Sequence, residues 1–70
     1  MKPGNMLVLL TGKTGKVYTC ETYLQAGVTL ASLIVFAIKQ NRQAIDWNTD
    51  SPIKAVFVDC EDNTKSIDLS

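Results

Sequence analysis

The sequence predicts an α+β protein in which a small antiparallel sheet carries one helix packed on one face. Three observations predict this class. Two apolar segments flank a glycine-containing turn, a central run has helical spacing, and two strand-like segments follow it. The element order is ββαββ, or ββαβββ if residues 44–47 form a short strand. Because no repeat, linker or change of composition interrupts the chain, residues 1–70 form a single domain.

The first two strands are expected to form a β-hairpin. Residues 6–11 are apolar and partly β-branched, residues 12–16 contain two glycines of the kind that hairpin turns use, and residues 17–24 resume a strand pattern. Alternation in the second strand puts one set of side chains on the predicted core face: Tyr18, Cys20, Thr22 and Leu24.

The middle of the chain has the spacing of an amphipathic helix. Thr29 can cap its start, and Asn41 is expected to end it in a left-handed conformation. Apolar residues recur at spacings of three and four: Leu30, Leu33, Ile34, Ala37 and Ile38. Three more widen this surface: Ala31, Val35 and Phe36. A helix that is apolar most of the way round is expected to be buried on more than one side.

Two further strands, residues 53–60 and 64–69, follow the helix and are joined by a turn at residues 61–63. A helix that crosses over from the second strand delivers the third strand parallel to it, and therefore antiparallel to the first. Residues 7–10 and 55–58 do not alternate, which is typical of strands buried on both faces, so they belong in the centre. The predicted strand order is therefore 2-1-3-4.

This order leaves one face of the sheet without a cover. A single helix shields one face, yet both central strands are apolar on both faces. A second copy of the protein, a different partner, or a sheet curled on itself could cover the other face.

The charges balance overall but are divided along the chain. Seven Lys and Arg face seven Asp and Glu, and a neutral chain is a poor binder of bulk nucleic acid or anionic lipid. Residues 1–45 hold five basic and one acidic residue, for +4, and residues 46–70 hold two basic and six acidic, for −4. Either these charges interleave on folding, or they form two patches that steer a partner or a second copy.

The chemistry of the side chains predicts no enzyme, no metal site and no cofactor. The chain has two cysteines, no histidine and no CxxC motif, whereas zinc sites and cysteine nucleophiles need such groups. In the predicted sheet Cys20 and Cys60 lie about 9–10 Å apart, farther than the roughly 7 Å that a disulfide spans. We therefore expect two free thiols.

The protein is expected to be cytoplasmic and not to enter a membrane. The apolar run near the N-terminus is shorter than the about 7–15 residues of a secretory signal. Residues 22–38 are uncharged and approach the length of a membrane-spanning helix. Gln25 and Ser32 interrupt this run, and the predicted helix start at Thr29 lies inside it.

Gly12-Lys13-Thr14 resembles part of a phosphate-binding P-loop, but two features exclude that motif. Leu7 stands where the first glycine should be, and a strand rather than a helix follows. We interpret the segment as an exposed hairpin tip. Its Lys13 and Lys16, beside Tyr18 and Tyr23, could form a small stacking surface for single-stranded nucleic acid.

Two other features invite a functional interpretation. Residues 59–63 form an acidic turn that could cap a strand, face a partner, or bind Mg²⁺ or Ca²⁺ weakly, although the sequence lacks the glycine and terminal glutamate of an EF-hand. Trp47 could be a lid over the end of the core or an anchor in an interface.

The resulting hypothesis is a small non-enzymatic protein–protein interaction module, inhibitor- or regulator-like, that binds or occludes another protein and forms a homodimer. The alternative is a nucleic-acid-binding module that uses the first hairpin. The candidate partner-binding residues are Lys13, Lys16, Trp47, Asp59, Glu61 and Asp62.

Overall fold

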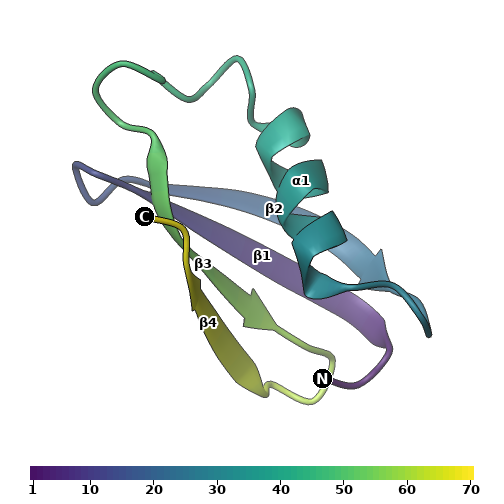
Figure 1. The fold of residues 1–70 in the computed structure, drawn as a ribbon. Coiled ribbons are helices and arrows are strands. Elements are labelled where there is room, and N and C mark those ends of the chain that lie inside the picture. The colour runs from purple at the N-terminus through teal and green to yellow at the C-terminus, as the bar shows by residue number, and fades with distance from the viewer.

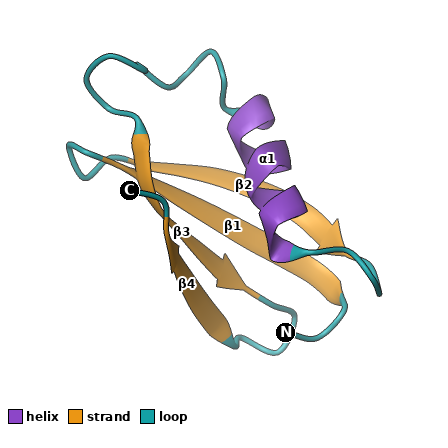
Figure 2. Cartoon of the chain, viewed as in Figure 1, coloured by secondary structure: helices purple, strands orange, loops and turns teal.

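A computed structural model describes residues 1–70 as a four-stranded antiparallel sheet with one helix on one face (Figures 1 and 2). The elements are β1 (Gly4–Gly12), β2 (Val17–Leu24), α1 (Leu30–Gln40), β3 (Pro52–Val58) and β4 (Thr64–Asp68). The strand order is β2-β1-β3-β4, as predicted. The order of elements is ββαββ, because residues 44–47 lie in an irregular loop with turns and not in a further strand.

Strand pairing fixes which side chains share a face. β1 pairs with β2 from Gly4 opposite Leu24 to Thr11 opposite Val17. On its other side β1 pairs with β3, and the register shifts between Thr11 and Gly12. Because cross-strand partners lie on the same face, alternate residues of β1 point toward α1 and the intervening residues point away from it.

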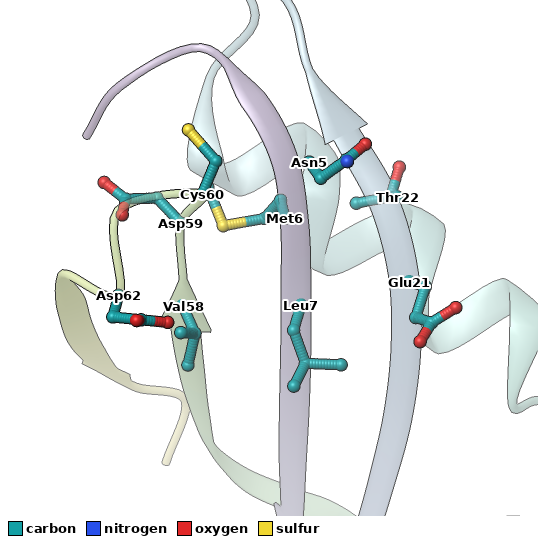
Figure 3. Close-up of a pocket in the computed structure, with 9 residues that line it drawn as sticks. All are labelled: Asn5, Met6, Leu7, Glu21, Thr22, Val58, Asp59, Cys60 and Asp62. Carbon is teal, nitrogen blue, oxygen red and sulfur yellow. The ribbon is translucent and has the colours of Figure 1, made fainter.

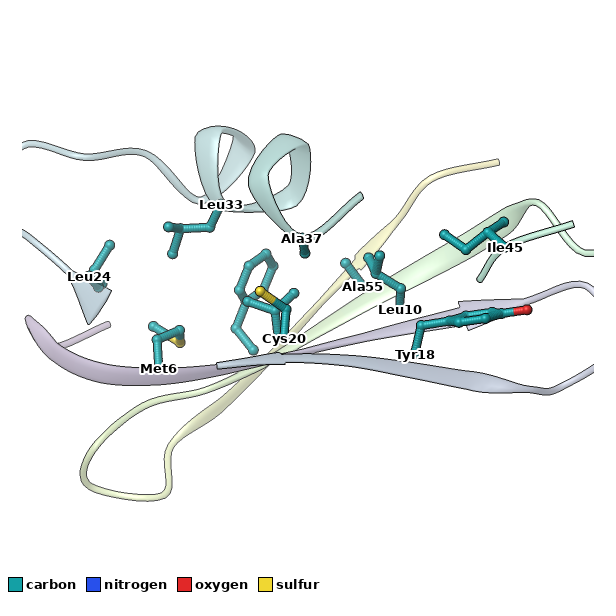
Figure 4. Packing of buried hydrophobic residues seen from close by; sticks show 11 residues of the cluster. Met6, Leu10, Tyr18, Cys20, Leu24, Leu33, Ala37, Ile45 and Ala55 are labelled. Carbon is teal, nitrogen blue, oxygen red and sulfur yellow. The ribbon is translucent and has the colours of Figure 1, made fainter. Parts of the chain in front are cut away.

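The core lies between the helix-facing side of the sheet and α1 (Figure 4). Its largest fully buried side chains are Val8 and Leu10 of β1 and Phe57 of β3. The other members are Met6, Tyr18, Cys20, Leu24, Leu33, Ala37, Ile45 and Ala55. The predicted core face of the second strand is thus confirmed, since its Tyr18, Cys20 and Leu24 are all buried.

Local hydrogen bonds explain where α1 begins and ends. The Thr29 hydroxyl accepts a bond from the Ser32 N–H at 3.2 Å, as an N-cap does. The helix ends before Asn41, but the left-handed conformation predicted for this residue is wrong: its φ is −104°. Asn41 needs no such conformation, because its side-chain Nδ2 donates to the carbonyl oxygens of Ala37, at 3.0 Å, and Thr19, at 3.1 Å.

The helix covers only part of the sheet and keeps one apolar side uncovered. It contacts β1 and β2 through Leu33 and Ala37. Val35 and Phe36 remain 52% and 41% exposed, so within one chain the expected burial on more than one side does not occur. No helix in the structure is long and apolar enough to cross a membrane.

Candidate functional site

The face of the sheet opposite α1, here called the open face, has an apolar centre. Leu7 of β1 lies opposite Val58 of β3, and Leu9 lies opposite Val56. All four side chains are half-buried although no helix or strand covers them. We call these four residues the apolar strip.

Exposed apolar side chains extend the strip along one edge of the open face. Val17 and Tyr23 of β2 are 50% and 57% exposed and lie opposite Thr11 and Asn5 of β1, which point away from the helix. Polar and charged residues frame the remainder: Thr19, Glu21, Lys54, Thr64, Ser66 and Asp68. An apolar centre inside a polar rim is the usual anatomy of a protein–protein interface.

The two sheet edges are less suited to pairing with another strand. Glu21 stands in the exposed edge strand β2, and Lys65 and Asp68 stand in the edge strand β4. The Asn41 side chain also donates to the Thr19 carbonyl of β2 at 3.1 Å. Charged side chains and an occupied carbonyl oppose edge-to-edge addition of strands, so the open face is the more accessible surface.

The acidic turn after β3 is organised around the buried carboxylate of Asp59. Its oxygens accept bonds from the backbone N–H groups of Glu61 at 2.8 Å, Asn63 at 2.9 Å and Lys2 at 3.3 Å, and from Asn63 Nδ2 at 3.2 Å. Burial raises the pKa of Asp59, but these donors outweigh burial and leave the pKa below its ordinary value. Asp59 therefore stabilises the turn.

The two other acidic residues of this turn are exposed. Glu61 forms an ion pair with Lys2, with 3.4 Å between its Oε1 and the lysine Nζ. Asp62 has a φ of 62°, in the left-handed region that Asp and Asn adopt more readily than most residues. No group of three or more Asp, Glu or Cys side chains is arranged to hold a metal ion.

A groove of about 590 Å³ lies between the start of β1 and the acidic turn (Figure 3). Leu7 and Val58 of the apolar strip line it, so the groove continues the open face. Three carboxylates also line it: Glu21, Asp59 and Asp62. We call this the acidic groove.

The exposed lysines Lys13 and Lys16 occupy the hairpin tip between β1 and β2, at the end of the sheet opposite the acidic turn (Figure 1). Lys16 Nζ lies 5.1 Å from the centre of the Tyr18 ring. The nucleic-acid stacking surface predicted here does not assemble, because Tyr18 is buried and Tyr23 lies at the far end of β2.

A buried carboxylate that the sequence did not single out ties the hairpin tip to the loop before β3. Asp50 accepts bonds from the Tyr18 hydroxyl at 2.6 Å, the Thr14 N–H at 2.9 Å and the Thr14 hydroxyl at 2.8 Å. The bond from Tyr18 lowers the pKa of Asp50, and the same bond raises the pKa of Tyr18 to about 12. Gly12 is required beside it, since a Cβ there would collide with the carboxylate.

Trp47 lies in the loop after α1 and is 47% exposed. Its Nε1 donates to the Arg42 carbonyl at 3.3 Å. It is not a buried lid, because Ile45 fills that position in the core (Figure 4). The six predicted site residues thus lie in three separate places: the hairpin tip, the acidic turn and this loop.

Both cysteines are free; Cys20 is buried beneath α1, and Cys60 is exposed at the acidic groove (Figure 3).

Comparison with protein-family models, curated proteins and solved structures finds no match to this chain.

Proposed function

We propose that this protein is a non-enzymatic protein–protein interaction module that binds through its open face, and that a second copy of the chain covers this face. The observation that carries the proposal is the apolar strip, Leu7, Leu9, Val56 and Val58, on the side of the sheet that no helix covers.

The small size of the protein favours a partner that covers the open face. A bare apolar sheet face invites aggregation, and only 14 of the 70 residues are buried in the isolated chain. Chains of this size commonly gain stability from association. A standard interface takes about 800 Å² from each partner, which is less than a fifth of the 4494 Å² surface of this protein.

A second copy is the partner that the chain itself offers. A two-fold axis brings the same surface of both subunits together, so an apolar strip meets an apolar strip and a polar rim meets a polar rim. The chain is formally neutral, yet it carries lysines at the hairpin tip and carboxylates in the acidic groove. A second copy can therefore offer charges of both signs to its partner.

The test is the molecular mass in solution. At micromolar concentration, light scattering should report about twice the 7.7 kDa mass of one chain. Leu9→Lys places a charge in the centre of the apolar strip and should yield a folded single chain. Val35→Lys adds the same charge to the exposed side of α1, where Val35 is 52% exposed, and should remain dimeric.

Circular dichroism would show whether Leu9→Lys folds, and Leu9→Thr, a milder change with a strand-compatible residue, provides a second variant. A parent protein that remains a single chain at high micromolar concentration would contradict the proposal. Equal masses for the parent and a folded Leu9→Lys variant would contradict it as well.

A further inference from the structure

The side of α1 that faces away from the sheet combines exposed apolar and basic side chains. Val35 is exposed on the side of the helix opposite the buried Leu33 and Ala37, and Phe36 is exposed beside it. Lys39 follows Val35 by four residues and Phe36 by three, so these three side chains are neighbours on the outer side of the helix.

This outer side leads into a basic cleft of about 830 Å³ at the end of the helix. Lys39, Arg42 and Trp47 line the cleft, and its other lining residues carry no charge. Neither Lys39 nor Arg42 has an ion-pair partner, since the only ion pair of the chain joins Lys2 and Glu61. Two full positive charges exceed the negative charge of about one half at the C-terminal end of a helix, so the cleft is positive.

No carboxylate interrupts the surface formed by the outer side of α1 and the cleft. The chain has no Asp or Glu between Glu21 and Asp46. Glu21 lies on the open face, on the other side of the sheet. Asp46 does not line the cleft, and its carboxylate accepts the backbone N–H groups of Asn48 at 3.0 Å and Thr49 at 3.4 Å. A chain that is neutral overall thus has a region in which every charge is positive.

We call Val35, Phe36, Lys39, Arg42 and Trp47 the helix surface, and we infer that it docks on a membrane surface that contains anionic lipids. In this docking α1 lies in the plane of the membrane. The apolar and aromatic side chains enter the boundary between headgroups and acyl chains, and the two basic side chains bind lipid phosphates. The protein lies on the membrane and does not cross it.

The composition of the helix surface favours a lipid over a protein groove. Helices that lie in a membrane interface present Phe and Trp to the acyl chains and Lys and Arg to the headgroups. Tryptophan is enriched at this boundary because its ring is apolar and its N–H is polar. The open face differs, because its rim carries both signs of charge: Lys54, Glu21 and Asp68.

The helix surface remains accessible when the open face is covered. The helix lies over one side of the sheet and the open face is the other side (Figure 2). A face-to-face dimer would therefore carry one helix surface on each outer side. The docking does not depend on the proposed function, and its failure would leave that proposal unchanged.

Trp47 is the only tryptophan of the chain, so its fluorescence reports the docking. Vesicles of three parts phosphatidylcholine and one part phosphatidylglycerol should shift the emission to shorter wavelength, because the indole ring leaves water. The protein should also sediment with these vesicles. Vesicles of phosphatidylcholine alone should have neither effect, and added salt should weaken the binding to the anionic vesicles.

Three variants that keep Trp47 test the parts of the helix surface. Lys39→Glu combined with Arg42→Glu should weaken binding to anionic vesicles about tenfold or more, because both attractions become repulsions. Phe36→Ser should weaken it about fivefold, because less apolar surface leaves water. Lys13→Glu combined with Lys16→Glu makes the same charge change at the hairpin tip and should leave binding within about twofold of the parent.

Circular dichroism of each variant checks that it is folded. The absence of both an emission shift and sedimentation with anionic vesicles would overturn the docking. Equal binding to the two kinds of vesicle, or an equal loss in the hairpin-tip variant, would overturn it as well, because binding would then not use Lys39 and Arg42. If soluble polyglutamate shifts the emission and the vesicles do not, the helix surface binds an acidic protein and the lipid docking is wrong.

Discussion

Asp50 accepts three hydrogen bonds, one from the Tyr18 hydroxyl and two from Thr14, and so attaches the loop before β3 to the hairpin tip. These contacts join residues more than thirty positions apart in the sequence. They hold the hairpin tip in a defined position relative to the loop before β3.

The stability of the protein should fall at both ends of the pH scale, because the hydrogen bond between Tyr18 and Asp50 depends on the protonation state of both groups. The contribution of Asp50 is complete above its ordinary pKa of 3.8 and is lost as the pH falls through the lowered value. The contribution of Tyr18 is complete below its ordinary pKa of 10.0 and is lost as the pH rises toward about 12. Thermal unfolding followed by circular dichroism should therefore give a decreasing Tm in both ranges.

Two matched variants isolate the alkaline part of this profile. Tyr18→Phe should have a lower Tm at neutral pH and a smaller alkaline decrease, because the group that titrates against Asp50 is gone. Tyr23→Phe removes the other, exposed tyrosine and should keep the parent profile. Equal alkaline decreases in the two variants would show that the bond between Tyr18 and Asp50 does not control stability there.

At the scale of elements, α1 has two apolar sides with different roles. Leu33 and Ala37 are buried against the sheet, whereas Val35 and Phe36 are exposed. The periodicity of the sequence identified the apolar residues but did not show that only one side is covered by this chain, since that depends on where the sheet lies.

Truncation on each side of α1 should separate these roles. Leu33→Ala leaves a cavity in the core and should lower the free energy of unfolding by about 2–5 kcal/mol, a large share of what a chain of this size possesses. Val35→Ala, on the exposed side, should change it by about 0.5 kcal/mol or less. Urea denaturation of both variants measures the difference, and equal losses would mean that the helix is rotated from the position described.

At the scale of the whole molecule, dimerisation would couple stability to protein concentration. A ligand that binds only the folded state stabilises it, and in the proposed dimer this ligand is a second chain. A hundredfold increase in concentration should raise Tm by roughly 5–10 °C in the parent protein. The Tm of Leu9→Lys should not depend on concentration, and a parent Tm that is equally constant would be evidence against association.

The sequence by itself determined the strand order and the existence of an uncovered face. A helical crossover from the second strand places the third strand antiparallel to the first, and the non-alternating runs 7–10 and 55–58 favour the two central positions of the sheet. The core positions Tyr18, Cys20 and Leu24 follow from alternation alone. Each of these properties is local or follows from a general packing rule.

Only the tertiary structure decided which polar residues meet. Three features depend on contacts between distant segments: the burial of Asp50, the exposure of Trp47 where Ile45 fills the core, and the negative φ of Asn41. The acidic groove likewise exists because strand register brings Glu21 of β2 near Asp62 of the turn after β3. The periodicity of a sequence predicts which side of an element faces inward. To predict a hydrogen bond or a groove, the relative positions of two elements must be known.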